Sequence, residues 1–413
     1  MKVQINSERL REQLYALASF SDVPSPAVTR IVFSATDLKA RNYIKGLFAD
    51  AGLQVREDGI GNMYARWEGE EKTLAAVATG SHVDAIPNAG MFDGTVGVLG
   101  GLEAIRSLQA CGFRPTKSIE LVMFTAEEPT RFGIGCLGSR LLSGAMTLES
   151  ARSLRDHEGR SLDEVRMAAG FTEGLARVPL PAGYYSAFVE LHIEQGPLLE
   201  KENIPIGVVT QIAAPASIRL TLVGEGGHAG AVLMPERRDA FLAAAEIALA
   251  VEQVAKSTGS LNSVATVGVC DVFPGAVNSI PSRVQLELDI RDTSGLRRDK
   301  MLEAILSSSN KISKQRNVAM TAEILNADDP ATADPAIVSA ISGSCEDVNT
   351  KYMQMVSRAY HDSLFMARIA PIGMIFIPCR NGVSHRPDEY ASDEDIKAGV
   401  TVLGHTLARL ASQ

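Results

Sequence analysis

The stretch "LAAVATGSHVDAIPNAGMFDG", residues 74–94, joins a strand-like run to a group of chemically reactive side chains. Its first part is apolar, and the apolar run stops at Ala78. His82, Asp84 and Asp93 then follow in glycine-containing backbone. In open α/β sheets, ligands bind just beyond the carboxyl ends of the strands. The stretch therefore predicts a buried strand that ends in part of a metal site, whose other ligands must follow other strands.

Helix and strand patterns alternate around this stretch. Apolar runs predict strands at residues 64–69, 74–80, 118–126 and 186–196, and helical spacing predicts helices at 37–51 and 95–110. Alternation of this kind is typical of an α/β layer. We therefore expect a mixed, mostly parallel sheet covered by helices.

The order of elements changes near residue 211. From there the patterns predict strand, helix, strand, strand, helix and strand at 217–223, 238–255, 263–273, 283–292, 296–315 and 319–325. This is the ferredoxin-like order. The stretch "NADDPATADP" then closes the segment, and the α/β character resumes with "MIFIPCRNGVSH". We expect residues 213–326 to form a small inserted α+β domain, and residues 1–212 and 327–413 to form one catalytic domain.

Composition limits the classes of partner and compartment. The net charge of -9 comes without a basic stripe, which argues against a nucleic-acid partner. The longest apolar run, residues 241–251, contains Glu246 and is too short to cross a bilayer, so we expect no membrane partner. Five cysteines without CxxC spacing favour reduced thiols. The first residues form an amphipathic pattern without the apolar core of a signal peptide, so we expect a cytoplasmic protein.

Side chains of the metal-ligand type also lie at the ends of three other predicted strands. They are Glu127 and Glu128 in "VMFTAEEPTRFG", Glu190, His192 and Glu194 in "FVELHIEQG", and His385 in "NGVSH". Each residue taken alone is more often solvated or structural. Their coincidence at four strand ends favours a site for one or two divalent metals.

A two-metal site needs a carboxylate that bridges the ions. Asp93 could serve as the bridge, His82 and His192 could bind one metal, and Glu128 and His385 could bind the other. Histidine and carboxylate ligands without cysteine suit Mn, Zn or Co. We expect two divalent ions per subunit, with Mn first and Zn or Co as alternatives.

Two neighbouring carboxylates remain outside this ligand set. Glu127 could take a proton from a water molecule and later pass it to a leaving amine. Asp84, two residues from His82, could orient that imidazole from behind, as metal-bound histidines usually require. We therefore predict Glu127 as the general base and Asp84 as a support for His82.

Six motifs together resemble the M20 metallopeptidase superfamily, and more narrowly its amidohydrolase branch. They are "GSHVDAIPNAGMFDG", "AEEPTRFG", "ELHIEQGPLLE", "GGHAG", "NSIPSRV" and "NGVSH". The likeness runs from about residue 30 to the end of the chain. It implies an aminopeptidase-like di-metal catalytic domain with an inserted lid that also forms the interface of a homodimer.

The resemblance also implies roles for individual residues. His82, Asp93, Glu128, His192 and His385 match the family's metal ligands, and Glu127 matches its general base. His228 in "GGHAG" resembles the lid histidine that polarises the scissile carbonyl, usually in the partner subunit's site. The residues expected to bind substrate are Asn278, Arg291, His361 and Gln195.

Within the branch, several stretches resemble ureidoglycolate amidohydrolases. They are "AIPNAG", "EEPTRFGIGCLGSRLL", "QIAAPAS" and "AYHDSLFMARI". The resemblance implies a hydrolase that cleaves a linear C–N bond in a small ureido-carboxylate and converts ureidoglycolate to glyoxylate, ammonia and carbon dioxide in purine catabolism.

Two alternatives remain open. The first is an allantoate or N-carbamoyl-L-amino-acid hydrolase, which the replacements at residues 231–233 of "HAGAVLMP" disfavour. The second is a binding protein without catalysis on the same scaffold. That hypothesis predicts a lost ligand or base, yet all six positions are intact.

Overall fold

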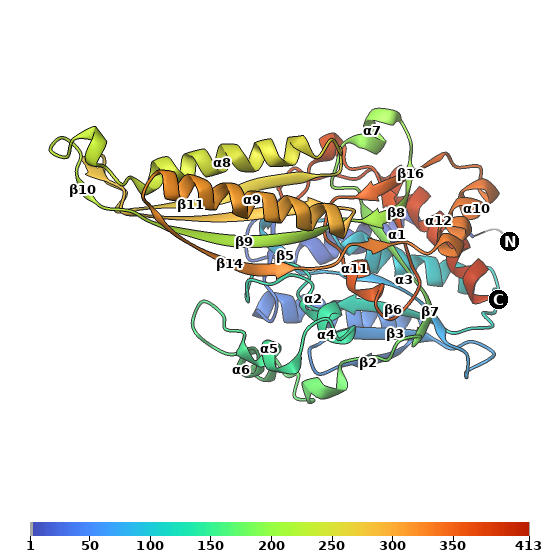
Figure 1. The fold of residues 1–413 in the computed structure, drawn as a ribbon. Helices are drawn as coiled ribbons and strands as arrows, with labels where there is room; N and C mark the ends of the chain where they lie inside the picture. Colours follow the sequence, from blue (N-terminus) through green and yellow to red (C-terminus); the bar gives the residue numbers. More distant parts are fainter. Residues whose placement is uncertain (1–2, 413) are drawn as a thin grey trace. The chain divides into compact units, whose positions relative to one another are not determined.

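A nine-stranded sheet organises the first of two compact units in the computed structural model, which describes residues 3–412 (Figure 1). This unit contains Met1–Thr210, Thr332–Ser357 and His361–Gln413. Its strands are β2 (Gln54–Glu57), β3 (Met63–Trp67), β4 (Ala76–His82), β6 (Ile119–Phe124), β7 (Tyr185–Ile193), β8 (Ile206–Ile212), β15 (Ala331–Thr332), β16 (Tyr352–Ser357) and β17 (Ile372–Ile377).

Four neighbouring strands at the centre of this sheet run parallel. The order is β15-β8-β17-β7-β4-β6-β3-β2, with β16 beside β8. The neighbours β17, β7, β4 and β6 run parallel, whereas β8 pairs antiparallel with β17, and β3 pairs antiparallel with β6 and β2. The sheet is therefore mixed, as expected, with antiparallel pairs on both sides of the four parallel strands.

Helices carry the core of this unit. Their bounds are α1 (Ser7–Ala18), α2 (Ala35–Asp50), α3 (Thr95–Ala110), α4 (Leu137–Leu142), α5 (Leu148–Ser153), α6 (Leu162–Ala168), α7 (Leu198–Glu202), α10 (Pro335–Asp347), α11 (Asp362–Met366) and α12 (Asp393–Ala411). Short 3-10 turns span Leu175–Arg177 and Arg380–Gly382, and β1 (Val28–Arg30) pairs with β5 (Ala85–Ala89).

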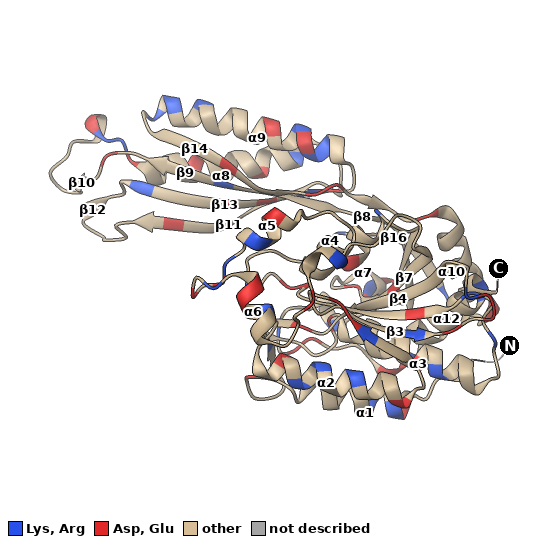
Figure 2. Ribbon diagram, turned by 90° about the horizontal axis from the view of Figure 1, so that it is seen from below, with Lys and Arg blue, Asp and Glu red and all other residues tan. Residues whose placement is uncertain are grey.

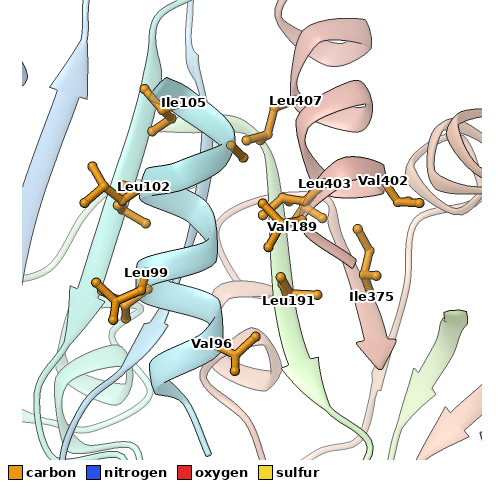
Figure 3. Close-up of a cluster of buried hydrophobic side chains, with 14 of the residues drawn as sticks. Val96, Leu99, Leu102, Ile105, Val189, Leu191, Ile375, Val402, Leu403 and Leu407 are labelled. Carbon is orange, nitrogen blue, oxygen red and sulfur yellow. The ribbon is translucent and has the colours of Figure 1, made fainter. Parts of the chain in front are cut away.

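The core lies where α3 and α12 pack together over β7 (Figure 3). Leu191 of β7 reaches both helices there, because it lies beside Gly100 of α3 and Gly399 of α12, and it is fully buried. Burial of such a side chain contributes about 1.5–3 kcal/mol. This contact fixes the strand and the helix on which the side chains described below depend.

The four parallel strands end at one edge of the sheet, and each is followed by residues that the sequence singled out. β4 is buried along its length and ends at His82, while β7 ends one residue after His192. β6 ends three residues before Glu127, and β17 ends eight residues before His385. Since carboxyl ends of parallel strands share an edge, this topology gathers the side chains.

The second unit contains Gln211–Ala331 and Arg358–Tyr360. Its elements are β9 (Ala214–Val223), β10 (Gly227–His228), a 3-10 turn (Met234–Glu236), α8 (Ala240–Ser257), β11 (Val264–Phe273), β12 (Ser279–Ile280), β13 (Arg283–Asp292), α9 (Gly295–Gln315) and β14 (Ala319–Ala327). β13 has the bounds predicted from the sequence, and the other main elements lie within a few residues of prediction.

The sheet of this unit is antiparallel in the order β11-β13-β9-β14. Burial alternates along β13, so one face packs under α8 and α9. The opposite face is polar, and Arg219 pairs there with Glu287 at 2.8 Å and with Glu323 at 3.0 Å. Alternation of this kind is typical of an antiparallel sheet covered on one side.

Charged residues of both signs are interspersed along α1 and α9 (Figure 2). Among the described residues, no helix combines the length and apolar character needed to cross a membrane.

Candidate metal centre

Two groups of possible metal donors share Asp93. The first joins it to His82 and His192, and the second joins it to Glu128 and His385; within each group the donor atoms lie within 4.8 Å of one another. Oδ1 of Asp93 lies 3.4 Å from Nε2 of His82 and 3.2 Å from Nε2 of His192. Oδ2 lies 3.4 Å from Nε2 of His385. One carboxylate thus presents one oxygen to each group.

The second group is completed by Glu128. Its Oε1 lies 3.5 Å from Nε2 of His385. Glu128 is buried, whereas the side chain of His385 is 46% exposed. Glu128 is thus covered by the protein, whereas a small molecule can approach this donor group from the side of His385.

Both buried imidazoles are oriented by backbone carbonyls. Nδ1 of His82 lies 3.1 Å from the carbonyl of Asp84, and Nδ1 of His192 lies 2.9 Å from the carbonyl of Ile193. Donation from Nδ1 leaves the lone pair on Nε2, and the N–H of Gly94 donates to Nε2 of His192 at 3.1 Å. Nε2 is therefore the atom that either ring can offer to a cation.

Asp84 supports the site differently from the sequence-based expectation. Its carboxylate lies 3.7 Å from Nδ1 of His82, so the carbonyl makes the closer contact. The carboxylate instead accepts hydrogen bonds from the N–H groups of Glu127 at 3.2 Å and Glu128 at 3.1 Å. Asp84 therefore ties the end of β4 to the loop that carries both glutamates.

Glycine is required where the chain passes His82. Gly94 has a φ of 65°, and a Cβ there would lie 2.4 Å from Nε2 of His82. Both the left-handed backbone and the close approach exclude a larger residue. α3 begins at the next residue, so this glycine lets Asp93 sit between the helix and the imidazole.

Glu127 lies beside the donor groups without belonging to either. Its Oε2 is 3.7 Å from Nε2 of His82, and its Oε1 accepts from the thiol of Cys136 at 3.3 Å. Burial raises the pKa of Glu127 well above its usual range. The side chain is thus held by one oxygen, with the other oxygen directed toward His82.

The electrostatics of the donor set favour a bound cation. Burial, followed by the charge of Asp93, raises the pKa of Glu128 to about 7. Burial also acts to raise the pKa of Asp93, but the neighbouring imidazoles, His192 first, outweigh it and hold that pKa well below its usual range. A divalent metal supplies positive charge to such buried carboxylates and uses the Nε2 lone pairs, so the residues present fit a metal.

A profile of the peptidase family M20/M25/M40 matches residues 78–409. The chain belongs to this family. It is 55% identical over 416 residues to a ureidoglycolate hydrolase of Oryza sativa subsp. japonica, covering 99% of this chain and 86% of that protein. It is 40% identical over 408 residues to an N-carbamoyl-L-amino acid amidohydrolase of Geobacillus stearothermophilus, covering 98% of this chain and 99% of that protein.

A solved structure is similar over nearly the whole chain. The crystal structure of AtUAH in complex with (S)-hydroxyglycine has a TM-score of 0.92 and 51% sequence identity. The match covers 99% of this chain and 98% of that chain. The mixed α/β fold of this M20 family member is therefore shared with a solved relative.

Two expected substrate-binding residues lie against the donor groups. Nε2 of Gln195 donates to Oδ2 of Asp93 at 2.6 Å, and its Oε1 is buried without a hydrogen-bond partner in the described structure. His361 is buried, its ring lies 4.6 Å from that of His192 between centroids, and its Nε2 lies 3.0 Å from Oγ of Ser357. Both therefore touch candidate ligands directly.

The other expected substrate residues belong to the second unit. His228 on β10 is exposed and faces Ser279 of β12 in the ladder, and the N–H of Ala229 donates to the carbonyl of Asn278 at 2.9 Å. The short ribbon thus brings His228 and Asn278 together. Arg291 lies on β13, where Asp289 pairs with its guanidinium at 2.7 and 3.1 Å.

The sequence interpretation missed several contributors. Glu190, noted only as a strand-end carboxylate, forms a third donor group with His192 and His361. Its own oxygens accept from the hydroxyls of Ser81 at 2.8 Å and Ser363 at 2.6 Å. No local sequence pattern predicts these two hydrogen bonds, because the serines lie more than 100 residues from Glu190 along the chain.

Proposed function

We propose that this chain is a metal-dependent amidohydrolase that cleaves the linear ureido C–N bond of ureidoglycolate and leads to glyoxylate, ammonia and carbon dioxide. The observation that carries the metal chemistry is the pair of donor groups that share Asp93, with Glu127 beside them. The substrate rests on the similarity to the ureidoglycolate hydrolase of rice across almost the whole chain. The ligand in the AtUAH structure, (S)-hydroxyglycine, is a small molecule, as ureidoglycolate is.

The proposed metal ligands are the five residues of the two donor groups. His82, His192 and Asp93 would hold one ion, and Asp93, Glu128 and His385 would hold the other. Divalent ions there would polarise a substrate carbonyl and make a water molecule more acidic. Nitrogen and oxygen donors suit Mn, with Zn or Co as alternatives.

Glu127 acts as general base and then as general acid in this proposal. Cys136 donates to Oε1, so Oε2 is the oxygen left to accept a proton from the attacking water. The same oxygen then returns the proton to the leaving nitrogen, which departs as ammonia. The carboxylate of Asp84 accepts hydrogen bonds from the backbone N–H groups of Glu127 and Glu128, and this restrains the direction of each side chain.

Residues 213–326 are proposed as a ferredoxin-like lid and dimerisation domain. Support comes from the strand–helix–strand–strand–helix–strand order and from β11, which lies at one edge of its sheet. β11 exposes apolar side chains, including Val269 and Phe273, the latter 55% exposed. An exposed apolar edge strand is a template for pairing with a second chain. The lid residues His228, Asn278 and Arg291 would bind the substrate's carbonyl and carboxylate.

The test compares substrates and metals on purified protein. Ureidoglycolate should give a higher kcat/KM than allantoate or N-carbamoyl-L-amino acids. Chelation should abolish turnover, and Mn²⁺ should restore it better than other divalent ions. A preference for an N-carbamoyl amino acid would assign the chain to the alternative activity seen in the name of its bacterial relative. Full turnover by protein shown by elemental analysis to hold no metal would refute the metal-dependent mechanism.

A further inference from the structure

The carboxylate of Glu389 connects two distant segments that carry candidate ligands. Its Oε1 accepts hydrogen bonds from the backbone N–H groups of Phe92 at 2.8 Å and Asp93 at 3.0 Å. Its Oε2 lies 2.8 Å from Oγ of Ser384, the residue before His385. Phe92 and Glu389 are 297 positions apart in the sequence. One buried side chain therefore links the loop before α3 to the loop after β17.

The link closes on the carboxylate of Asp93. Oγ of Ser384 lies 2.7 Å from Oδ2 of Asp93 as well as 2.8 Å from Oε2 of Glu389. Glu389 thus reaches the backbone of Asp93 directly and its side chain through one hydroxyl. A ring of this kind restrains both the position of Asp93 and the rotation of its carboxylate.

The chain passes close to Glu389 at this loop. Met91 and Phe92 line a cavity of about 630 Å³ together with Tyr390 and Glu389, while Phe92 is buried and its ring lies 5.9 Å from that of Tyr390 between centroids. Gly90 lies so close that a Cβ there would be 2.3 Å from Cβ of Glu389 and 2.4 Å from its Oε1. The sequence has glycine where Glu389 approaches, so the carboxylate can reach the backbone N–H groups of Phe92 and Asp93.

We propose that Glu389 is a positioning residue for the shared ligand Asp93. By accepting from the N–H of Asp93 and engaging Ser384, it holds the carboxylate so that Oδ1 faces one donor group and Oδ2 faces the other. A bridging carboxylate has to present both oxygens at once, and a small rotation removes one of them. The inference rests on the proposed metal centre, and its test therefore measures metal affinity independently of turnover.

The experiment compares Glu389→Ala with Glu389→Gln in Mn²⁺-loaded protein. Each protein is equilibrated with a colorimetric chelator, and metal retained on the protein gives the affinity. Glu389→Ala should weaken binding by about 10–100-fold, the usual effect of losing a group that supports a ligand. Glu389→Gln should stay close to wild type, because its amide oxygen accepts from both N–H groups and its NH₂ donates to Ser384.

Two further variants separate positioning from general stability. Glu103→Ala also removes a buried carboxylate, which accepts hydrogen bonds from the backbone N–H of Asn6 and from the hydroxyl of Ser107. This variant should lower thermal stability and leave metal affinity unchanged. Gly90→Ala should displace Glu389 and weaken metal binding even where Glu389→Ala folds poorly.

The outcomes distinguish this inference from the proposed function. Wild-type affinity in Glu389→Ala, or equal losses in Glu389→Ala and Glu389→Gln, would overturn the positioning role while leaving the metal centre intact. Wild-type protein that retains no Mn²⁺ would overturn the metal centre, and this inference with it.

Discussion

Oδ2 of Asp84 accepts a hydrogen bond from the backbone N–H of Glu128 at 3.1 Å. Oδ1 accepts from the N–H of Glu127 at 3.2 Å, so the two oxygens hold two successive peptide groups. The loop they hold begins at Ala126, whose φ of 55° is unusual for a residue with a side chain. The direction of both glutamates therefore depends on the carboxylate of Asp84, which binds their backbone N–H groups.

Asp84→Asn should lower kcat/KM by about 10–100-fold, the scale expected when a supporting group around metal ligands is changed. An amide keeps one acceptor oxygen but turns an NH₂ group toward the other backbone N–H, which misplaces one glutamate. Steady-state kinetics and metal content at equal protein concentration provide the measurement.

The matched control is Asp156→Asn. Asp156 is also buried and accepts from two backbone N–H groups, those of Glu158 and Arg160, within its own turn. It makes none of the contacts of the donor groups, so its variant should retain kcat/KM. Equal kinetic losses in both variants would mean that Asp84 matters only for folding.

Glu127→Gln should lower kcat by at least about 100-fold, because it removes the proton acceptor while keeping the size of the side chain. Metal content should not change, since Glu127 belongs to neither donor group. Elemental analysis and kinetics on the same sample test both statements. Glu128→Gln is the paired variant and should lose metal, because Oε1 of Glu128 faces Nε2 of His385. A folded Glu127→Gln protein without metal would show that the two roles are reversed.

Arg291→Lys should weaken kcat/KM for a carboxylate substrate by about 10-fold or more, since hydrogen bonds to charged groups contribute roughly 1.5–3 kcal/mol. A guanidinium can bind a carboxylate with two parallel bonds, as it already does with Asp289, and an ammonium cannot. Arg219→Lys, on the same sheet and paired with Glu287, is the control and should be silent. An unchanged kcat/KM in Arg291→Lys would place carboxylate recognition elsewhere, with Arg358 or His361 as the next candidates.

The local sequence was sufficient to predict an element when the residues at its two ends mark where it begins and stops. The helix predicted at residues 95–110 has the bounds of α3, because glycines lie on both sides of the apolar pattern. The strand predicted at 283–292 coincides with β13, whose polar and apolar residues alternate from Arg283 to Arg291. The candidate ligands could be predicted from the sequence because His, Asp and Glu stand out at the ends of otherwise apolar strand patterns.

Contacts between distant segments could not be predicted in this way. Glu389 reaches Asp93 across 296 positions, and the pairing of β7 with both β4 and β17 depends on the whole topology. The start of α12, in contrast, is marked in the local sequence. Ser392 and three acidic residues in the first turn are typical of a capped helix N-terminus. The support of His82 by Asp84 stays a prediction: the carbonyl of Asp84 lies 3.1 Å from Nδ1 of His82, and its carboxylate lies 3.7 Å from the same atom.

The geometry of the second unit bears on how His228 and Arg291 can serve one substrate. Arg283 pairs with Val223 at one end of the sheet, and Arg291 pairs with Pro215 eight residues farther along β13. At about 3.3 Å per residue the two ends are roughly 26 Å apart. The ribbon of β10 and β12 that carries His228 joins the sheet at the Arg283 end (Figure 1). A small molecule cannot span this distance, so the two residues can contact the same substrate only if they come from different chains.

Two inactive variants should therefore complement each other. His228→Ala and Glu127→Gln are prepared separately and mixed under conditions that exchange subunits. If His228 acts on the partner's site, a mixed dimer has one site with both defects and one site with neither. Activity should then return to about a quarter of wild type, because random exchange makes half of the symmetric dimers mixed. The control mixture contains Glu127→Gln and the double variant, and it should stay inactive. If the first mixture also stays inactive although mass spectrometry shows mixed dimers, His228 serves its own chain, and Arg291 then has to bind something other than the substrate.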